Sequence, residues 1–524
     1  MGIYLNPGNS LFGEALRSKI YVDKTGLVAY ANEVLGTEQK NICVSRPRRF
    51  GKSMAANMLC AYYCRTCDSR SMFEGLEVAN SPAFEEHLNQ YDVLFFNAQR
   101  FLSRAPSLVE IPEYWQEMTL RDMYKEYPEA VTNANGSLIS ALEEVYAETG
   151  RGFVIIIDEW DCIFRETRDN AEAQVHYLDF LRDLLKNQPY VKLAYMTGIL
   201  PIKKYGTHSA LNMFDEYSMT SPKELARFVG FTEAEVRGLC ERFEMDFEET
   251  RHWYDGYRLK GVGHVYSPKS VVDAMRFHAF ESYWTSTETY EALRVYIDMN
   301  FDGLKDSIVT MMGGVPRKID VTSFQNDMTT FVTQDDVLTL LVHLGYLGYD
   351  AETKSVFIPN EEVRAEFVRA MKAPMWNDVI QTISDSEKLL EATWNRDGDT
   401  VARMLDAVHM DAVSILEYNN ETALSCVISL AYYSARNYYT MVRELPTGKG
   451  FADLVFLPRK HAVNHPAMVV ELKWNRSADT AIAQIKNKRY TRALEDYSGE
   501  LLLVGSSYDQ ATKAHSCIIE QTDK

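Results

Sequence analysis

The sequence predicts an α/β fold in three parts. We expect a P-loop parallel sheet flanked by helices in residues 1–220, a helical, winged-helix-like region in residues 221–375, and a second α/β domain in residues 376–524. Three observations predict this division. Short apolar runs alternate with helical patterns in the first part, helical patterns dominate the second, and the third contains strand-like runs followed by a helix. At roughly 100–200 residues per domain, a chain of 524 residues corresponds to about three domains.

Four apolar runs in the first part are expected to be strands. They lie at residues 41–44, 93–96, 153–157 and 193–196. The runs are nearly continuous rather than alternating, which is typical of strands with both faces covered by helices. The run at 153–157 is the clearest, because it contains three successive isoleucines.

Between the first strand and the next helix lies a candidate phosphate-binding loop. Residues 45–53 read Ser-Arg-Pro-Arg-Arg-Phe-Gly-Lys-Ser. Backbone N–H groups at a helix start bind phosphate oxygens, Lys52 would reach the β- and γ-phosphates, and Ser53 would ligate Mg²⁺. The usual loop has a glycine five positions before Gly51, where this chain has Arg46. The alternative is an ordinary helix start with an incidental Gly-Lys-Ser.

Acidic and polar residues follow two of the other strands. Asp158 and Glu159 end the third strand, where Asp158 would hold Mg²⁺ through water and Glu159 would orient or deprotonate the attacking water. Thr197 ends the fourth strand and could sense the γ-phosphate. The alternatives are a solvated turn for the two acids and a common strand exit for Thr197-Gly198.

The middle region has helical patterns with one interruption. Residues 221–224 read as a helix start, with a proline at the first position. Residues 335–347 predict an amphipathic helix, residues 348–358 a hairpin, and a further helix follows from Glu361. This order could be a winged helix. A packing module is favoured over a DNA-reading role.

The third part contains a candidate metal site. Asp453 opens the strand expected at 452–457, and Glu471 and Lys473 end the one expected at 468–472. Alternation places Glu471 and Lys473 on the same face. Two carboxylates can bind a divalent cation, with Lys473 stabilising charge or activating water. The alternative is an edge strand with alternating charges.

Charge and composition bear on two questions, whether the protein binds nucleic acid and whether it spans a membrane. The formal net charge is −19, which repels nucleic acid unless basic residues cluster. From Arg443 to Tyr490 there are nine Lys or Arg residues against four acidic ones, as a phosphate-backbone binder requires. No run approaches 18 apolar residues and no signal-peptide pattern is present, so we expect a cytoplasmic protein without a membrane span.

Eight scattered cysteines fit reduced, buried thiols. Cys60, Cys64 and Cys67 could contribute to a zinc site, but no fourth ligand stands at a convincing spacing. Buried thiols are therefore favoured.

The chain resembles the bacterial AAA-ATPase-like family whose members carry a C-terminal PD-(D/E)xK nuclease-superfamily domain. The resemblance spans nearly the whole chain. The matching motifs are Tyr21-Val22-Asp23-Lys24-Thr25, the loop from Arg46 to Ser53, Ile157-Asp158-Glu159-Trp160-Asp161, Thr197-Gly198, Trp253-Tyr254-Asp255-Gly256-Tyr257-Arg258, and Asp453 with Glu471-Leu472-Lys473. In that family an arginine-rich loop replaces the glycine-rich one, so Arg46 is a family trait.

The resemblance and the motifs together define the expected site residues. Those expected to bind ATP are Arg46, Pro47, Arg49, Phe50, Gly51, Lys52, Ser53, Met54, Asp158 and Thr197, with Glu159 catalytic and Ser53 and Asp158 on Mg²⁺. Those expected in the nuclease-like site are Asp453, Glu471, Lys473, the helix residue Gln484 and the first-helix acid Glu421, with Asp453 and Glu471 on Mg²⁺ or Mn²⁺. Arg46, Arg48, Arg49 and Arg258 could each neutralise phosphate charge, and the alternative for Arg48 and Arg49 is that they are solvated loop residues.

Three functions remain open at this point. The first is an ATP-binding and ATP-hydrolysing protein that is coupled to, or gates, a metal-dependent nuclease acting on DNA. The second is a nucleotide-switched regulatory protein whose C-terminal domain binds nucleic acid without cleavage. The third is an ATPase that acts on protein partners and uses the nuclease fold as a scaffold. Retention of Asp453, Glu471 and Lys473 favours the first.

Overall fold

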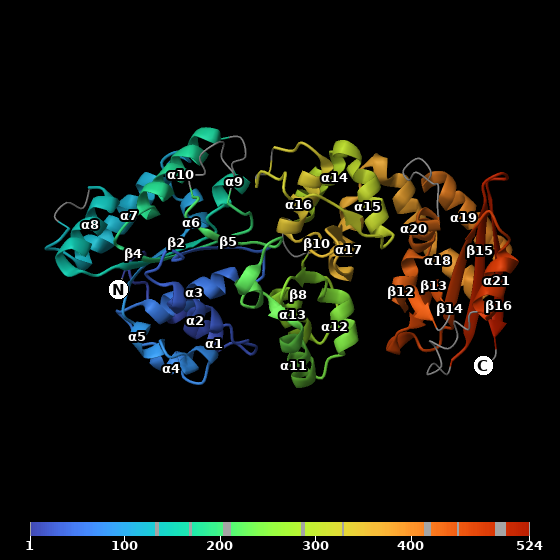
Figure 1. Ribbon diagram of the computed structural model, residues 1–524, viewed down its shortest axis with the longest axis horizontal. Coiled ribbons are helices and arrows are strands. Elements are labelled where there is room, and N and C mark those ends of the chain that lie inside the picture. The colour runs from blue at the N-terminus through green and yellow to red at the C-terminus, as the bar shows by residue number, and fades with distance from the viewer. Residues whose placement is uncertain are drawn as a thin grey trace. The chain divides into compact units, whose positions relative to one another are not determined.

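The computed structural model describes residues 2–131, 136–166, 170–202, 211–284, 289–326, 328, 330–412, 421–447, 450–487 and 499–522. These residues form two compact units. The first unit contains residues 1–288 and 318–365, and the second contains residues 289–317 and 366–524. Figure 1 colours the chain from its N-terminus to its C-terminus.

A five-stranded parallel sheet is the centre of the first unit. Its strands are β1 (Asn41–Ser45), β2 (Asp92–Asn97), β3 (Phe153–Asp158), β4 (Val191–Gly198) and β5 (Asp215–Tyr217), in the order β2-β3-β4-β1-β5. All four predicted strands are confirmed. The short β5 was missed, because Asp215 and Glu216 give it no apolar run.

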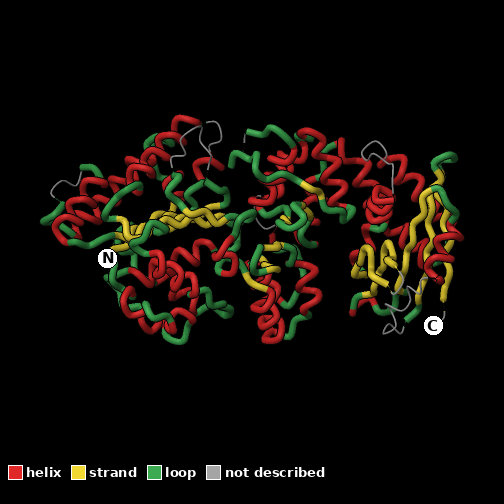
Figure 2. The backbone as a smooth tube through the Cα atoms, viewed as in Figure 1, coloured by secondary structure: helices red, strands yellow, loops and turns green. Residues whose placement is uncertain are grey.

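Helices cover both faces of this sheet (Figures 1 and 2). On one side lie α1 (Ser10–Leu16), α2 (Gly26–Val34), α3 (Lys52–Tyr63), α4 (Arg70–Phe73) and α5 (Phe84–His87). On the other lie α6 (Ala98–Leu102), α7 (Ile111–Glu126), α8 (Leu138–Thr149), α9 (Cys162–Glu166) and α10 (Ala171–Leu185). Every residue of β1 and of β3 is consequently buried, which is the physical reason for their continuous apolar sequences.

The rest of the first unit is mainly helical, with two small antiparallel sheets. Its elements are β6 (Phe231–Thr232), α11 (Glu233–Phe243), α12 (Phe247–Tyr254), β7 (Tyr257–Leu259), β8 (Gly263–Tyr266), α13 (Pro268–Phe277), α16 (Gln334–Leu344), β10 (Gly348–Asp350), β11 (Ser355–Phe357) and the start of α17 (Glu361–Ala370). The helix, hairpin and helix predicted from residue 335 onward are confirmed.

The prediction of a helix starting at residues 221–224 is wrong. The chain forms only a five-residue 3₁₀ turn there, Lys223–Arg227. The turn ends because Gly230 adopts a φ of 109° and leads the chain directly into β6 at Phe231. The first full helix of this region is α11, which a capping box between Thr232 and Glu235 starts.

Gly256 occupies a position that no other residue fits, which gives a test of this packing. Its φ is 112°, and a Cβ there would lie 2.1 Å from the Pro359 carbonyl oxygen. Gly256→Ala is expected to destabilise the protein by roughly 2–4 kcal/mol, from overpacking and a strained backbone together. Chemical denaturation measures this.

The matched control is Gly238→Ala in α11, where a Cβ would meet nothing within 4 Å. That change is expected to stabilise by about 0.5–1 kcal/mol through helix propensity. Equal effects of the two substitutions would contradict the close approach at Gly256.

The second unit is built on a mixed five-stranded sheet. Its strands are β12 (Tyr439–Thr447), β13 (Gly450–Pro458), β14 (Ala467–Trp474), β15 (Leu501–Asp509) and β16 (Ala514–Thr522), in sequence order. Only β14 and β15 are parallel, and α21 (Ala478–Asn487) lies between them in the chain. The predicted β13, β14 and α21 are confirmed.

Two helical layers cover this sheet. Helices α18 (Asn377–Trp394), α19 (Gly398–Ala412) and α20 (Glu421–Ala431) pack with Met468, Val470 and Leu472 of β14 in one core. Ala467 and Val469 of β14 pack with α21 in another. Since side chains alternate along a strand, the positions after Val469 that share its face, 471 and 473, belong to the α21 side. The unit also contains α14 (Thr289–Asp298) and α15 (Leu304–Met312).

Within the described part of the chain, no helix combines the length and the apolar character needed to cross a membrane.

Candidate functional site

Strand register brings polar residues together at the carboxyl edge of the parallel sheet. Asn97 at the end of β2 lies opposite Asp158 at the end of β3. Thr197 near the end of β4 pairs with Val44 of β1. Val44 is one residue from the end of β1, where the phosphate loop begins. Because carboxyl ends of parallel strands meet at one edge, these polar groups and the loop are neighbours.

The loop closes on the side chain of Lys52. Gly51 has a φ of 91° and begins α3, whose first residue is Lys52. The Lys52 Nζ donates to the carbonyl oxygens of Arg46 at 3.0 Å and Pro47 at 2.9 Å. Burial lowers the pKa of Lys52, and the charges of Glu159, Asp161 and Asp158 oppose this.

Arg46 supports the loop from inside the fold. Its side chain is fully buried and donates to the carbonyl oxygens of Ser45 and Tyr217, both at 2.9 Å. Burial lowers its pKa to about 10. The guanidinium therefore joins the end of β1 to β5 and contacts backbone atoms of the protein.

Other residues of the loop pack against the helical region. Arg49 donates to the carbonyl oxygen of Tyr283, and the ring of Phe50 meets that of Tyr257 edge-on at 5.1 Å. Pro47 packs closely against Gly345: a Cβ added to Gly345 would lie 2.7 Å from the Cβ of Pro47. The loop is thus held by residues far from it in sequence.

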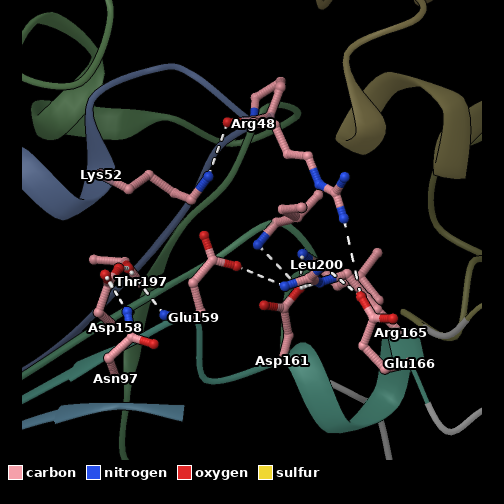
Figure 3. A network of polar contacts seen from close by, with 12 residues as sticks. Arg48, Lys52, Asn97, Asp158, Glu159, Asp161, Arg165, Glu166, Thr197 and Leu200 are labelled. Atoms are coloured by element: carbon pink, nitrogen blue, oxygen red, sulfur yellow. Dashed lines mark hydrogen bonds and ion pairs between the residues drawn. The ribbon is translucent and has the colours of Figure 1, made fainter. Parts of the chain in front are cut away.

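The acidic residues after β3 differ in their surroundings (Figure 3). Asp158 accepts hydrogen bonds from the hydroxyl of Thr197 and, at 3.1 Å, from the amide of Asn97. Glu159 has a φ of 58°, and its Oε2 accepts from Arg165 Nη2 at 2.6 Å. Asp161 is fully buried, so Glu159 is the acid of this segment that faces open space.

Burial also sets the acidity of Glu159. Burial raises the pKa of this carboxyl, and the negative charges of Asp161 and Asp158 raise it further. The positive charges of Lys52 and Arg165 lower the pKa, with the larger effect from Lys52.

A cavity of about 700 Å³ opens in front of the loop. The expected site residues that line it are Arg49, Phe50, Gly51, Lys52, Ser53, Met54 and Glu159. Three others lie buried behind its wall: Arg46, Asp158 and Thr197 are each at most 1% exposed. The structure therefore separates residues on the cavity surface from residues that hold them.

Much of the cavity lining was missed by sequence reasoning. It comes from residues 18–22 and Lys24, from Phe228, Gly230 and Phe231, and from α13, which contributes Pro268, Lys269, Val272 and Arg276. The first segment overlaps Tyr21-Val22-Asp23-Lys24-Thr25, which the family resemblance had already marked. No local signal marked α13.

Two of the arginines left open in the sequence pair with acids. Arg48 lies 4.0 Å from Glu166, and Arg258 lies 3.1 Å from Asp350. Both arginine side chains are about half exposed, at 44% and 54%.

In the second unit, four predicted residues meet on the α21 side of the sheet. Lys473 Nζ lies 2.8 Å from Glu471 Oε1, and the amide of Gln484 on α21 donates to the same oxygen. Asp453 Oδ2 accepts from the backbone N–H of Leu472 at 2.7 Å, so its carboxylate lies beside β14 between Glu471 and Lys473. Glu471 and Lys473 are buried, and Asp453 is partly exposed.

Some predicted features fall outside the described residues. The backbone of Glu421 begins α20, but its side chain is outside that description, as are Lys449, Lys488 and Arg489 of the basic segment. Cys60 and Cys64 are buried, as favoured, but Cys67 is partly exposed. Among the described side chains, no group of three or more His, Cys, Asp and Glu is placed to hold a metal ion.

Comparison with known proteins agrees with both segments. Residues 14–207 match the family of predicted AAA-ATPases, and residues 419–516 match the PD-(D/E)XK nuclease superfamily. The chain is 26% identical over 282 residues to an uncharacterised protein from the vnfD 5′ region of Azotobacter chroococcum mcd 1, which covers 51% of each chain.

Among solved structures, the ORC2 protein of Aeropyrum pernix in its ADPNP and ADP complexes is similar at a TM-score of 0.30 and 14% identity. That match covers 69% of this chain and 98% of the other. The two family matches therefore show an AAA-ATPase-like segment followed by a PD-(D/E)XK nuclease-superfamily segment in this chain.

Proposed function

We propose that this protein binds and hydrolyses ATP in the cavity of its first unit, and that this activity is coupled to, or gates, a metal-dependent nuclease acting on DNA. The observation that carries the proposal is one cavity, lined by Lys52, Ser53 and Glu159 together. We further propose the three-part division at residues 220 and 375, with the nuclease in the last part.

The cavity residues fit the demands of ATP hydrolysis. The N-terminus of α3 offers backbone N–H groups to phosphate oxygens. Lys52 supplies a cation whose Nζ donates to two carbonyl oxygens, and phosphate oxygens can replace these acceptors. Glu159 is the carboxylate in position to orient and deprotonate a water molecule.

Ser53 and Asp158 are the residues that would hold Mg²⁺, which neutralises charge on the transferred phosphoryl group. The exposed hydroxyl of Ser53 suits a direct bond. Asp158 is buried, with its carboxylate oriented by Thr197 and Asn97, and this suits contact through water. In this arrangement Thr197 acts by orienting Asp158.

The second unit presents the groups that phosphodiester cleavage needs. Asp453 and Glu471 stand on adjacent strands and would hold Mg²⁺ or Mn²⁺, which polarises the scissile phosphate. Lys473 supplies a fixed positive charge beside them, and Gln484 orients Glu471. Glu421 is proposed as a further acid of this site.

Lys52→Ala is expected to weaken ATP binding by about 10- to 100-fold, since a charged hydrogen-bond donor to the phosphates is lost. Calorimetric titration of the full chain with ATP and Mg²⁺ measures this. The control is Lys388→Ala on α18, whose side chain is 73% exposed; it should bind as the wild type does. Unchanged affinity in a folded Lys52→Ala protein would overturn the phosphate-loop assignment.

A further inference from the structure

Arg165 on α9 is bonded directly to the proposed catalytic acid. Its Nη2 lies 2.6 Å from Glu159 Oε2, and Figure 3 shows the Glu159 carboxylate between Lys52 and Arg165. Arg165 is not one of the described residues that line the cavity, and its side chain is only 5% exposed. It therefore contacts Glu159 from outside the cavity lining.

The position of Arg165 is itself fixed by buried groups. Its Nε lies 3.1 Å from Asp161 Oδ2. The same oxygen accepts the backbone N–H groups of Ile199 at 3.0 Å and Leu200 at 2.8 Å. The guanidinium is thus tied to the backbone after β4 through a fully buried carboxylate, and a planar fork with two bonded nitrogens has little freedom to turn.

Glu159 needs such a support, because it lies between two cations, Arg165 and Lys52 (Figure 3). A carboxylate drawn to Lys52 would neutralise the cation that phosphate requires and would turn away from water. Moreover, the φ of 58° puts Glu159 in a left-handed conformation that surrounding contacts must maintain.

We propose that Arg165 is a positioning residue for ATP hydrolysis, which holds one oxygen of Glu159 so that the other faces the cavity and stays separate from Lys52. The proposal rests on the proposed function of Glu159 as general base. It assigns to Asp161 the role of anchoring Arg165.

The first test is Arg165→Gln in the full chain. A misplaced catalytic group costs up to about 100-fold in rate, so kcat for ATP hydrolysis is expected to fall by about 10- to 100-fold with KM for ATP within about threefold. Arg165→Lys keeps the positive charge but loses the planar fork of the guanidinium. Its kcat should therefore lie between that of the wild type and that of Arg165→Gln. The matched control is Arg121→Gln on α7, a 58% exposed arginine, which should leave both constants unchanged.

The second test separates positioning from a general structural effect. In a protein that already carries Glu159→Gln, adding Arg165→Gln should leave the residual rate within about twofold, because the group it positions is gone. An equal loss of rate in both backgrounds would overturn the proposal, as would wild-type kcat in Arg165→Gln. Should Arg165→Gln show no cooperative thermal transition, the same pair of measurements is made with Arg165→Lys.

These outcomes differ from failure of the proposed function. If the wild type does not hydrolyse ATP, or if Glu159→Gln hydrolyses it normally, the assignment of Glu159 fails before Arg165 is considered. If Glu159→Gln is slow and Arg165→Gln is normal, only the inference on Arg165 fails.

Discussion

Glu159→Gln is expected to slow ATP hydrolysis by about 10²- to 10⁴-fold, the usual contribution of a positioned general base. Glutamine has the same shape as glutamate and can still accept from Arg165, so the support of the side chain should survive. It cannot take a proton from water. ATP binding should therefore persist, because Lys52 and the start of α3 are untouched.

Steady-state phosphate release and calorimetric titration, made on the same preparation, separate turnover from binding. The matched control is Glu117→Gln, because Glu117 is a 49% exposed residue of α7. This variant should hydrolyse ATP at the wild-type rate. Near-normal hydrolysis in Glu159→Gln would make Glu159 structural. A wild type that binds ATP without hydrolysing it would favour the nucleotide-switched regulatory protein instead.

The parallel sheet and the acid edge were predictable because their signals are local. Strands covered on both faces read as continuous apolar runs, and all four were found from that pattern. Asp158 and Glu159 could be located in the same way, because they stand at the end of the apolar run that forms β3. Likewise, alternation along β14 was enough to place Glu471 and Lys473 on one face, and the structure brings their charged ends to 2.8 Å.

The features that could not be predicted from the sequence depend on contacts between segments that are far apart in the chain. Arg46 appeared to be a phosphate ligand because it belongs to the loop, but the structure buries it against Tyr217, 171 positions away. Residues of α13 line the cavity only because that helix packs beside the loop. Arg165 carried no motif, and its bond to Glu159 depends on the turn that follows β3.

The strand β15 was missed for a different reason. It begins as an apolar run, but Gly505, Ser506 and Ser507 interrupt that run, and glycine is depleted in strands. The chain forms a strand there because β14 and β16 pair with it on both sides. Tertiary pairing therefore overrides the local preference.

Asp453→Ala is expected to abolish metal-dependent cleavage of DNA and to remove metal binding with it. One carboxylate rarely holds Mg²⁺ without help from a substrate phosphate, so Glu471 alone should not retain the ion. Lys473→Ala should also abolish cleavage, because the buried charge beside Glu471 is lost, but the ion should still bind.

In the proposed function, basic residues between 443 and 490 contact the phosphate backbone, so both variants are expected still to bind nucleic acid. Binding should fall steeply with added salt, because this segment works against a chain of net charge −19. ATPase activity should persist in each variant, as the cavity of the first unit is unchanged.

Gel assays with labelled duplex and single strands over a Mn²⁺ series measure cleavage, and filter binding over a salt series measures affinity. Asp399→Ala, at an exposed position of α19, and Lys388→Ala are matched controls that should cut as the wild type does. Cleavage by Asp453→Ala at the wild-type rate would refute the nuclease assignment. A wild type that binds DNA and never cuts it would make residues 376–524 a binding module, because the carboxylates on β13 and β14 would then hold no productive metal.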